Sequence, residues 1–176
     1  HSLEHALRIF SLNYDRCIES LESHEPRFHI EQGFGLRTAR KPWSYRLMSS
    51  DLQRRENIEV PDVDVFLYKL HGSIDWRRNR DQELEWVPDI HEALKIDPDH
   101  LEIIFGREAK LDAREPFSFY FSEFRSACRA AKLIVVVGYS FADDHINQVV
   151  GDALRFADST KHLLVIVGPS KQKSRS

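Results

Sequence analysis

The chain has 176 residues, enough for one domain with a sizeable core, and 41% of them are apolar, which excludes wholesale disorder. Lysine and arginine number 25 against 28 aspartates and glutamates, so the formal net charge is −3. This near-balance gives no support for a nucleic-acid or anionic-membrane partner. No apolar run is longer than Leu133 to Val137, which is far shorter than the roughly 18 residues of a membrane span. The two cysteines, Cys17 and Cys128, lack the spacing of a disulfide framework or zinc module, and we expect a reducing cytoplasm.

The first part of the chain predicts a strand, a turn and a helix, followed by a long irregular segment. Ala6 to Leu12 is a short apolar stretch that leads into Asn-Tyr-Asp, and Arg16 to Leu21 carries helix formers. From Ser23 to Val60 the sequence is polar and charged and is interrupted by glycines and prolines. This composition predicts an excursion or insertion over the surface, at about residues 23–60.

A second strand is predicted at Val63 to Leu70, where β-branched and aromatic residues predominate until the chain reaches His71-Gly72. The sequence that follows, from Arg77 to Asp112, is mixed and charged. A small strand at Leu101 to Phe105 is the one element that we expect there.

The last third of the chain predicts alternating helices and strands. Apolar residues at helical spacing predict a helix with one buried face: Phe117, Phe121, Phe124, Cys128 and Ala131. Leu133 to Val137 is a continuous apolar run, typical of a strand that is covered on both faces of a parallel sheet. Asp143 and Asp144 offer an N-cap for a helix through about Phe156, and Leu163 to Val167 predicts a further buried strand.

The order helix, strand, helix, strand indicates the fold class. Right-handed crossovers between such elements build a doubly wound, mostly parallel sheet with helices on both faces. We therefore expect an α/β fold without internal repeats. One domain is expected over residues 1–169, followed by a loose polar tail at 170–176.

Each predicted strand ends in polar residues or glycine, and ligands bind outside the carboxyl ends of the strands in open parallel sheets. These ends read Asn13-Tyr14-Asp15, His71-Gly72-Ser73-Ile74-Asp75, Gly138-Tyr139-Ser140 and Gly168-Pro169-Ser170. Turn chemistry explains most of these residue types, but a histidine directly after a buried strand is less expected of a turn. We therefore predict a cleft that contains the imidazole of His71, the carboxamide of Asn13, the hydroxyl of Ser140 and the backbone N–H groups of Gly72 and Gly138.

The residue types in this cleft suit proton transfer and sugar binding better than phosphoryl transfer. Imidazole exchanges protons near neutral pH, and a carboxamide orients a water or a sugar hydroxyl without carrying charge. No GxxxxGK[ST] loop is present, and Gly33-Phe34-Gly35 neither follows a predicted strand nor opens a helix. Asp143 and Asp144 would repel a diphosphate, so they are expected either to meet ribose hydroxyls or to serve as a plain helix cap.

Two other enzyme chemistries are open on these residues. Gly138 to Ala142 resembles the G-x-S-x-G elbow of serine hydrolases with alanine in the last position, but the later histidines, His145 and His162, do not suit a triad. A metal-dependent hydrolase would draw on side chains of suitable type that lack a recognised metal-binding spacing, namely His71, Asp75, Asp144 and His145.

A basic and aromatic run is the one feature that could suit a single-stranded nucleic acid. It consists of Trp76-Arg77-Arg78 with Arg80. Acidic residues surround it, however, so a solvated face of mixed charge is the expected role.

Three segments resemble, in order, the motifs of the sirtuin-like domains found in bacterial defence and related proteins. They are Ser11-Leu12-Asn13-Tyr14-Asp15, Lys69-Leu70-His71-Gly72-Ser73-Ile74-Asp75-Trp76, and Gly138-Tyr139-Ser140-Phe141-Ala142-Asp143-Asp144-His145-Ile146-Asn147. Sirtuins proper carry T-Q-N-I-D, a histidine-glycine pair and a G-T-S turn in this order. The resemblance covers most of the chain, including Ile103-Ile104-Phe105-Gly106 and Lys110, and it implies a Rossmann-like sheet that binds NAD.

The resemblance also implies roles for individual residues. Asn13 matches the asparagine near the nicotinamide ribose, and His71 matches the catalytic histidine. Cleavage of the nicotinamide N-glycosidic bond passes through an oxocarbenium-like state, which requires a positioned ribose and a proton acceptor. Asn13 suits the first task and His71 the second. The residues expected to bind the nucleotide are Asp15, Gly72, Gly138, Ser140 and Asp144.

Departures from the sirtuin pattern narrow the expected activity. Leu12 replaces the glutamine of the motif, and Gly168 stands where sirtuins usually place an asparagine. No four-cysteine zinc module is present, which favours NAD hydrolysis over deacylation. The Gly-rich strand, loop and helix that open such domains and cradle the pyrophosphate are not found before Ala6. We therefore expect either a fragment of a larger protein or a domain that has lost this unit.

The sequence thus predicts a cytoplasmic domain that cleaves NAD, its substrate, to nicotinamide and ADP-ribose without a metal. The expected setting is the effector part of a larger stress or antiviral defence protein. The main alternative is a catalytically incomplete sensor or scaffold that binds NAD or an ADP-ribose nucleotide, and a metal-dependent or serine hydrolase is a further one. Further domains of the same polypeptide and a homo-oligomer are the expected partners, whereas a membrane and nucleic acid are not.

Overall fold

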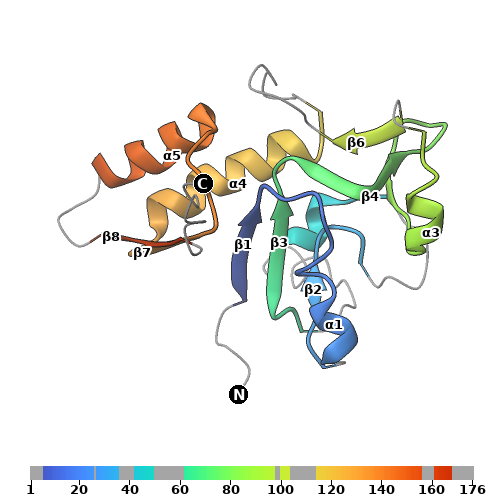
Figure 1. Ribbon diagram of the computed structural model, residues 1–176, viewed down its shortest axis with the longest axis horizontal. Coiled ribbons are helices and arrows are strands. Elements are labelled where there is room, and N and C mark those ends of the chain that lie inside the picture. Colours follow the sequence, from blue (N-terminus) through green and yellow to red (C-terminus); the bar gives the residue numbers. More distant parts are fainter. Residues whose placement is uncertain are drawn as a thin grey trace, which may run out of the picture. The chain divides into compact units, whose positions relative to one another are not determined.

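The computed structural model describes residues 6–25, 27–35, 42–49, 62–97, 100–103, 114–155 and 161–167. They form a mixed α/β protein that contains parallel sheets, which confirms the predicted fold class and is consistent with a Rossmann-like fold (Figure 1). The chain divides into two compact units, His1–Tyr120 and Phe121–Ser176, whose positions relative to one another are not determined. The predicted site residues are therefore located within each unit separately.

A parallel sheet forms the centre of the first unit. Its strand order is β1 (Leu7–Ser11), β3 (Val65–Lys69) and β2 (Ile30–Glu31), as Figure 1 shows. All five residues of β3 are buried, which explains why its sequence is a nearly continuous apolar run between two neighbouring strands. The strands predicted from Ala6 and Val63 are thus confirmed. The core of this sheet consists of Ile30, Val65 and Leu67, with Ile9, Ile18 and Phe28 packed against it.

The surface path predicted for the segment after Ser23 is wrong for residues 30–35, which are all buried. The first two of them form β2, and Met48 at the end of the 3₁₀ helix η1 (Tyr45–Met48) is buried as well. The polar composition misled the prediction because the buried carboxylate of Glu31 is paired with backbone N–H groups rather than with water. The segment also supplies Phe34 and Trp43 to an aromatic core that contains Trp76 and Tyr120.

A small antiparallel sheet completes the first unit. Its strand order is β5 (Leu84–Trp86), β4 (Gly72–Arg78) and β6 (Leu101–Ile103). β6 confirms the first three residues of the small strand predicted from Leu101. β4 and β5 were not predicted, because charged residues interrupt the apolar pattern of both strands. In β4 these are the buried Asp75 and the half-buried Arg77 and Arg78, and in β5 Glu85 lies between two buried residues. The short helices of this unit are α1 (Leu21–His24) and α3 (Ile90–Ala93), so the helix predicted from Arg16 begins only at Leu21.

The second unit alternates helices and strands in the predicted order. Helix α4 (Phe117–Ala130) begins in the first unit and is followed by β7 (Leu133–Val137), α5 (Asp144–Arg155) and β8 (His162–Ile166). The two strands are parallel, with Leu133 beside His162 and Val137 beside Ile166. Every residue of β8 is exposed, and exposed residues alternate with half-buried ones along β7. The burial predicted for both strands is therefore not observed, because a two-stranded sheet leaves much of its surface uncovered.

Some predictions lie outside the described residues. These include the tail at 170–176, the polar residues Gly168-Pro169 predicted after the last strand, and the resemblance at Ile104, Phe105, Gly106 and Lys110. The extent of one domain over residues 1–169 stays a prediction. Across the part of the chain that the structure describes, no helix combines the length and apolar character required to cross a bilayer.

Candidate functional site

Asn13 and His71 follow two neighbouring parallel strands at the same distance. Ser11 and Lys69 pair at the ends of β1 and β3, and each of the two site residues comes two positions later. The backbone N–H of Leu70 donates to the Ser11 carbonyl at 2.9 Å, which extends the pairing beyond the strands. The structure therefore brings Asn13 and His71 to one edge of the sheet, as predicted. Asn13 is exposed and His71 is half-buried.

The loop after β1 holds Asn13 and Asp15 through its own hydrogen bonds. The Asn13 N–H donates to Ser11 Oγ at 3.1 Å, and the Cys17 N–H donates to Asp15 Oδ1 at 2.9 Å. The hydrogen bonds from Cys17 lower the pKa of the Asp15 carboxyl. Asp15 therefore presents an ionised carboxylate near this edge of the sheet, where it can accept hydrogen bonds from hydroxyl groups. We call this edge, with Asn13, Asp15 and His71, the rim. The Tyr14 ring centroid lies 6.3 Å from that of the His71 imidazole.

Gly72 has a structural role that the sequence did not reveal. It is buried, with φ +83°, and a Cβ atom there would lie 1.9 Å from the backbone oxygen of Glu102 in β6. Only glycine fits this backbone conformation and this close approach. The histidine-glycine pair therefore turns the chain sharply from β3 into β4 directly after His71. Its predicted contact with the nucleotide stays a prediction.

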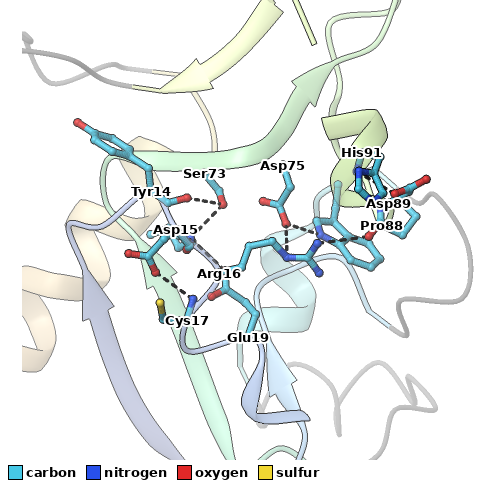
Figure 2. A network of polar contacts seen from close by, with 12 residues as sticks. Tyr14, Asp15, Arg16, Cys17, Glu19, Ser73, Asp75, Pro88, Asp89 and His91 are labelled. Carbon is cyan, nitrogen blue, oxygen red and sulfur yellow. Dashed lines mark hydrogen bonds and ion pairs between the residues drawn. The ribbon is translucent and has the colours of Figure 1, made fainter. Parts of the chain in front are cut away.

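A buried polar network lies directly behind this rim (Figure 2). Lys69 Nζ donates to the Asp15 carbonyl, to Glu19 Oε1 at 3.0 Å and to Ser73 Oγ at 2.9 Å. Lys69, Glu19 and Ser73 are all buried. The signal that could have revealed the network is a lysine at the end of an otherwise apolar strand, but its partners are not recognisable from the sequence.

The turn after β7 carries the remaining predicted site residues in the second unit. Gly138 has φ +64° with open space where a Cβ would be, and Ser140 is exposed. Asp143 Oδ1 accepts the N–H groups of His145 and Ile146 at 3.0 and 3.2 Å, so Asp143 caps α5 and Asp144 is its exposed first residue. The convergence of this turn with Asn13 and His71 stays a prediction, because the two groups belong to different units.

A family model for the SIR2-like domain matches residues 7–176. The chain belongs to the SIR2-like domain family. This confirms the sirtuin-like resemblance of the three ordered motifs. Members of the family are generally NAD-dependent enzymes, so an NAD-related function follows for this chain. No curated protein matches the sequence closely enough to count as a relative.

The surroundings of Asp75 do not favour the metal-dependent hydrolase that the sequence analysis left open. Asp75 is buried, and its Oδ2 lies 3.2 Å from Arg16 Nε and accepts the Trp86 indole N–H at 2.8 Å (Figure 2). One of its two carboxylate oxygens is thus engaged by Arg16 and Trp86. Among the residues that the structure describes, no group of three or more His, Cys, Asp or Glu side chains is arranged to hold a metal ion.

The serine-hydrolase alternative also lacks support within the second unit of the SIR2-like domain. A nucleophile elbow places its serine on a strained turn, whereas the positive φ angles in this turn belong to Gly138 and Phe141. His162 pairs with Leu133 at the start of β7, whereas Ser140 follows the end of that strand. His145 lies in the first turn of α5, where its backbone N–H is part of the helix cap. These positions do not assemble a triad around Ser140.

Proposed function

We propose that this SIR2-like domain hydrolyses NAD to nicotinamide and ADP-ribose. The observation that carries the proposal is the placement of Asn13 and His71 at equal offsets beyond the paired ends of β1 and β3. This edge, at the carboxyl ends of parallel strands, is where open α/β sheets bind their ligands. The ionised carboxylate of Asp15 belongs to the same edge. An imidazole, a carboxamide and a carboxylate together suit a ribose that carries a cationic pyridinium group, which leaves as neutral nicotinamide.

In the proposed reaction, the bond between C1′ of the ribose and the nicotinamide nitrogen breaks, and its electron pair stays on nicotinamide. The ribose passes through an oxocarbenium-like state, and the oxygen of a water molecule adds to C1′. His71 accepts the proton that this water loses, and Asn13 orients the ribose or the water. Asp15 accepts hydrogen bonds from ribose hydroxyls, and its negative charge favours the positively charged intermediate state. In the second unit, Gly138 and Ser140 are the residues that the proposal assigns to nucleotide binding, and Asp144 is assigned to ribose hydroxyls.

The proposal is tested by measuring nicotinamide release from NAD with the full-length protein and with the His71→Ala and Asn13→Ala variants. Loss of a general base should lower kcat by about 100-fold or more, because such groups contribute about 10²–10⁴-fold. His91→Ala is the matched control, since His91 is an exposed histidine of α3 outside the rim. Undiminished turnover in both site variants would show that the assigned roles are wrong.

The same assay separates the alternatives. A protein that binds NAD without releasing nicotinamide is a sensor or scaffold rather than a hydrolase. Ser140→Ala should mainly weaken NAD affinity if Ser140 contacts the nucleotide, whereas a serine hydrolase would lose all activity. Release that depends on an added divalent metal would instead favour the metal-dependent hydrolase.

The setting of this activity is part of the proposal. The motif resemblance supports an effector that acts in the cytoplasm within a larger stress or antiviral defence protein, with further domains of the same polypeptide and a homo-oligomer as partners. NAD depletion in stressed cells that carry the wild-type protein, but not in cells that carry His71→Ala, is the expected result. Equal NAD levels in the two would contradict the effector role.

A further inference from the structure

The Lys69 ammonium is buried between the two segments that carry the proposed catalytic residues. Its three N–H groups are matched by three acceptors, namely the Asp15 carbonyl, Glu19 Oε1 and Ser73 Oγ. The side chains of Lys69 and Glu19 are 1% and 3% exposed, so the pair is almost fully removed from water. A charge buried in this way is held in one geometry by its partners.

Lys69 is connected to two consecutive backbone carbonyls of the loop that follows β1 and carries Asn13. It donates directly to the Asp15 carbonyl, and it reaches the Tyr14 carbonyl through Ser73, whose hydroxyl donates to that oxygen at 3.3 Å. The backbone N–H of Ile74 also donates to the Tyr14 carbonyl, at 3.1 Å. Figure 2 shows Tyr14 and Asp15 beside Ser73 in this arrangement. The loop is therefore fastened to the start of β4 immediately after Asn13.

The same residue lies two positions before His71 on β3. One ammonium therefore connects the strand that leads to the imidazole with the loop that carries the carboxamide. The chain separations show that this link is tertiary, since Lys69 is 54 residues from Asp15 and 50 residues from Glu19. Without it, the Tyr14 carbonyl would still accept hydrogen bonds from Ser73 and Ile74, but the Asp15 carbonyl would lose its bond to the end of β3.

Two simpler roles fit the network less well. A serine and a lysine 2.9 Å apart could form a nucleophilic pair, but Ser73 is 0% exposed and its hydroxyl proton points to the Tyr14 carbonyl. A purely stabilising role is weakly motivated, because well-packed apolar side chains often replace a buried ion pair without loss of stability. Apolar side chains, however, could not hold the Tyr14 and Asp15 carbonyls in fixed positions, because they cannot donate hydrogen bonds.

We infer that Lys69 is a positioning residue, which holds the Asn13 loop in register with His71 for NAD cleavage. The inference rests on the proposed function, and it assigns Lys69 no contact with substrate. Misplacement of a catalytic group by about 1 Å costs on the order of 100-fold in rate. Release of the loop should therefore lower kcat by about 10- to 100-fold, with a smaller effect on KM.

The test is the double variant Lys69→Met/Glu19→Gln in the full-length protein. Methionine retains most of the lysine stem, and glutamine avoids the unpaired buried carboxylate that a single substitution would leave. His29→Gln is the matched control, because it removes a partly buried charge beside Asp64 and Val65, at the opposite end of β3 from Lys69. Relative to this control, the kcat of the double variant should be about 10- to 100-fold lower. Its melting temperature should fall by no more than that of the control.

Ser73→Ala provides a graded check, because it removes the link from Lys69 to the Tyr14 carbonyl but leaves the Lys69 contacts to Asp15 and Glu19. Its loss in kcat should lie between those of the control and the double variant. A double variant with the same kcat as His29→Gln would overturn the inference, since a role in stability alone predicts that equality.

Amide hydrogen exchange tests the positioning role independently of NAD cleavage. In the double variant, the Asn13 and Cys17 N–H groups should exchange faster than in His29→Gln. If the wild-type protein releases no nicotinamide, the proposed function fails and exchange alone decides the positioning role. Faster exchange at these two groups would then support it, and equal rates in the two variants would overturn it.

Discussion

His29 is held between two carboxylates at the start of β2. Its Nδ1 lies 3.5 Å from Glu22 Oε1, its Nε2 lies 3.8 Å from Glu31 Oε2, and its side chain is 14% exposed. Glu22 and Glu31 together raise the pKa of His29 to about 9, because they stabilise the charged imidazolium. The position of Glu31 is fixed, since its Oε1 accepts the backbone N–H groups of four successive residues, Gln32, Gly33, Phe34 and Gly35.

This arrangement predicts a pH-dependent contribution to stability. The difference between a folded pKa of about 9 and the ordinary value of 6.5 corresponds to about 3 kcal/mol, at about 1.36 kcal/mol per pKa unit. Because the folded pKa of His29 is raised, this stabilisation is complete below pH about 6.5 and is lost as the pH rises through about 9. His29→Gln should therefore lower the free energy of unfolding by about 3 kcal/mol at pH 6 and by little at pH 10.

Urea denaturation followed by tryptophan fluorescence measures this effect selectively. The three tryptophans, Trp43, Trp76 and Trp86, all lie in the same compact unit as His29. Wild type, His29→Gln and the control His91→Gln are compared at pH 6, 7.5, 9 and 10, and the difference from wild type is calculated at each pH. The reasoning is refuted if the loss caused by His29→Gln is the same at all four values, because the imidazole would then not titrate between its two carboxylates.

Two further substitutions test local backbone geometry. Gly72→Ala should destabilise the first unit by at least about 2 kcal/mol in urea denaturation, because it combines a strained φ with a clash against the Glu102 carbonyl. The control Gly151→Ala should be neutral or stabilising, since a Cβ in that helix meets its nearest neighbour at 3.5 Å. Asp143→Ala should lower the thermal stability of α5, seen by circular dichroism, by about 1 kcal/mol through loss of its N-cap, whereas Asp143→Asn should retain most of it. Equal melting curves for the Asp143 variants would contradict the capping role.

The strands β1 and β3 could be predicted because apolar residues follow one another over a short span and then stop at polar residues. Parallel strands bring their carboxyl ends to one edge, so the neighbourhood of Asn13 and His71 also followed from the sequence. The helix from Phe117 was predicted because its apolar residues repeat at helical spacing. In each case the decisive information lies in a short stretch of sequence.

The elements that could not be predicted depend on contacts between distant residues. Glu31 is buried in a polar stretch, where backbone N–H groups donate to one of its carboxylate oxygens, and composition does not reveal such pairing. The partners of Lys69 are likewise set by the tertiary fold, with Glu19 50 residues away. Gly72 was recognised as part of a motif, but its need to be glycine arises from the approach of β6, which lies about 30 residues later.

The His29 network and the Lys69 network lie at opposite ends of β3, and this separates stability from function in the proposed enzyme. The His29 network contacts Asp64 and Val65 where the strand begins, far from the carboxyl edge that carries His71. The Lys69 network is at that edge and contacts the loop of Asn13. A rise in pH through about 9 should therefore destabilise the fold at the His29 end of β3, without changing the geometry of the rim. Substitutions in the second network should disturb the rim while the fold persists, because Ile74 still anchors the loop to β4.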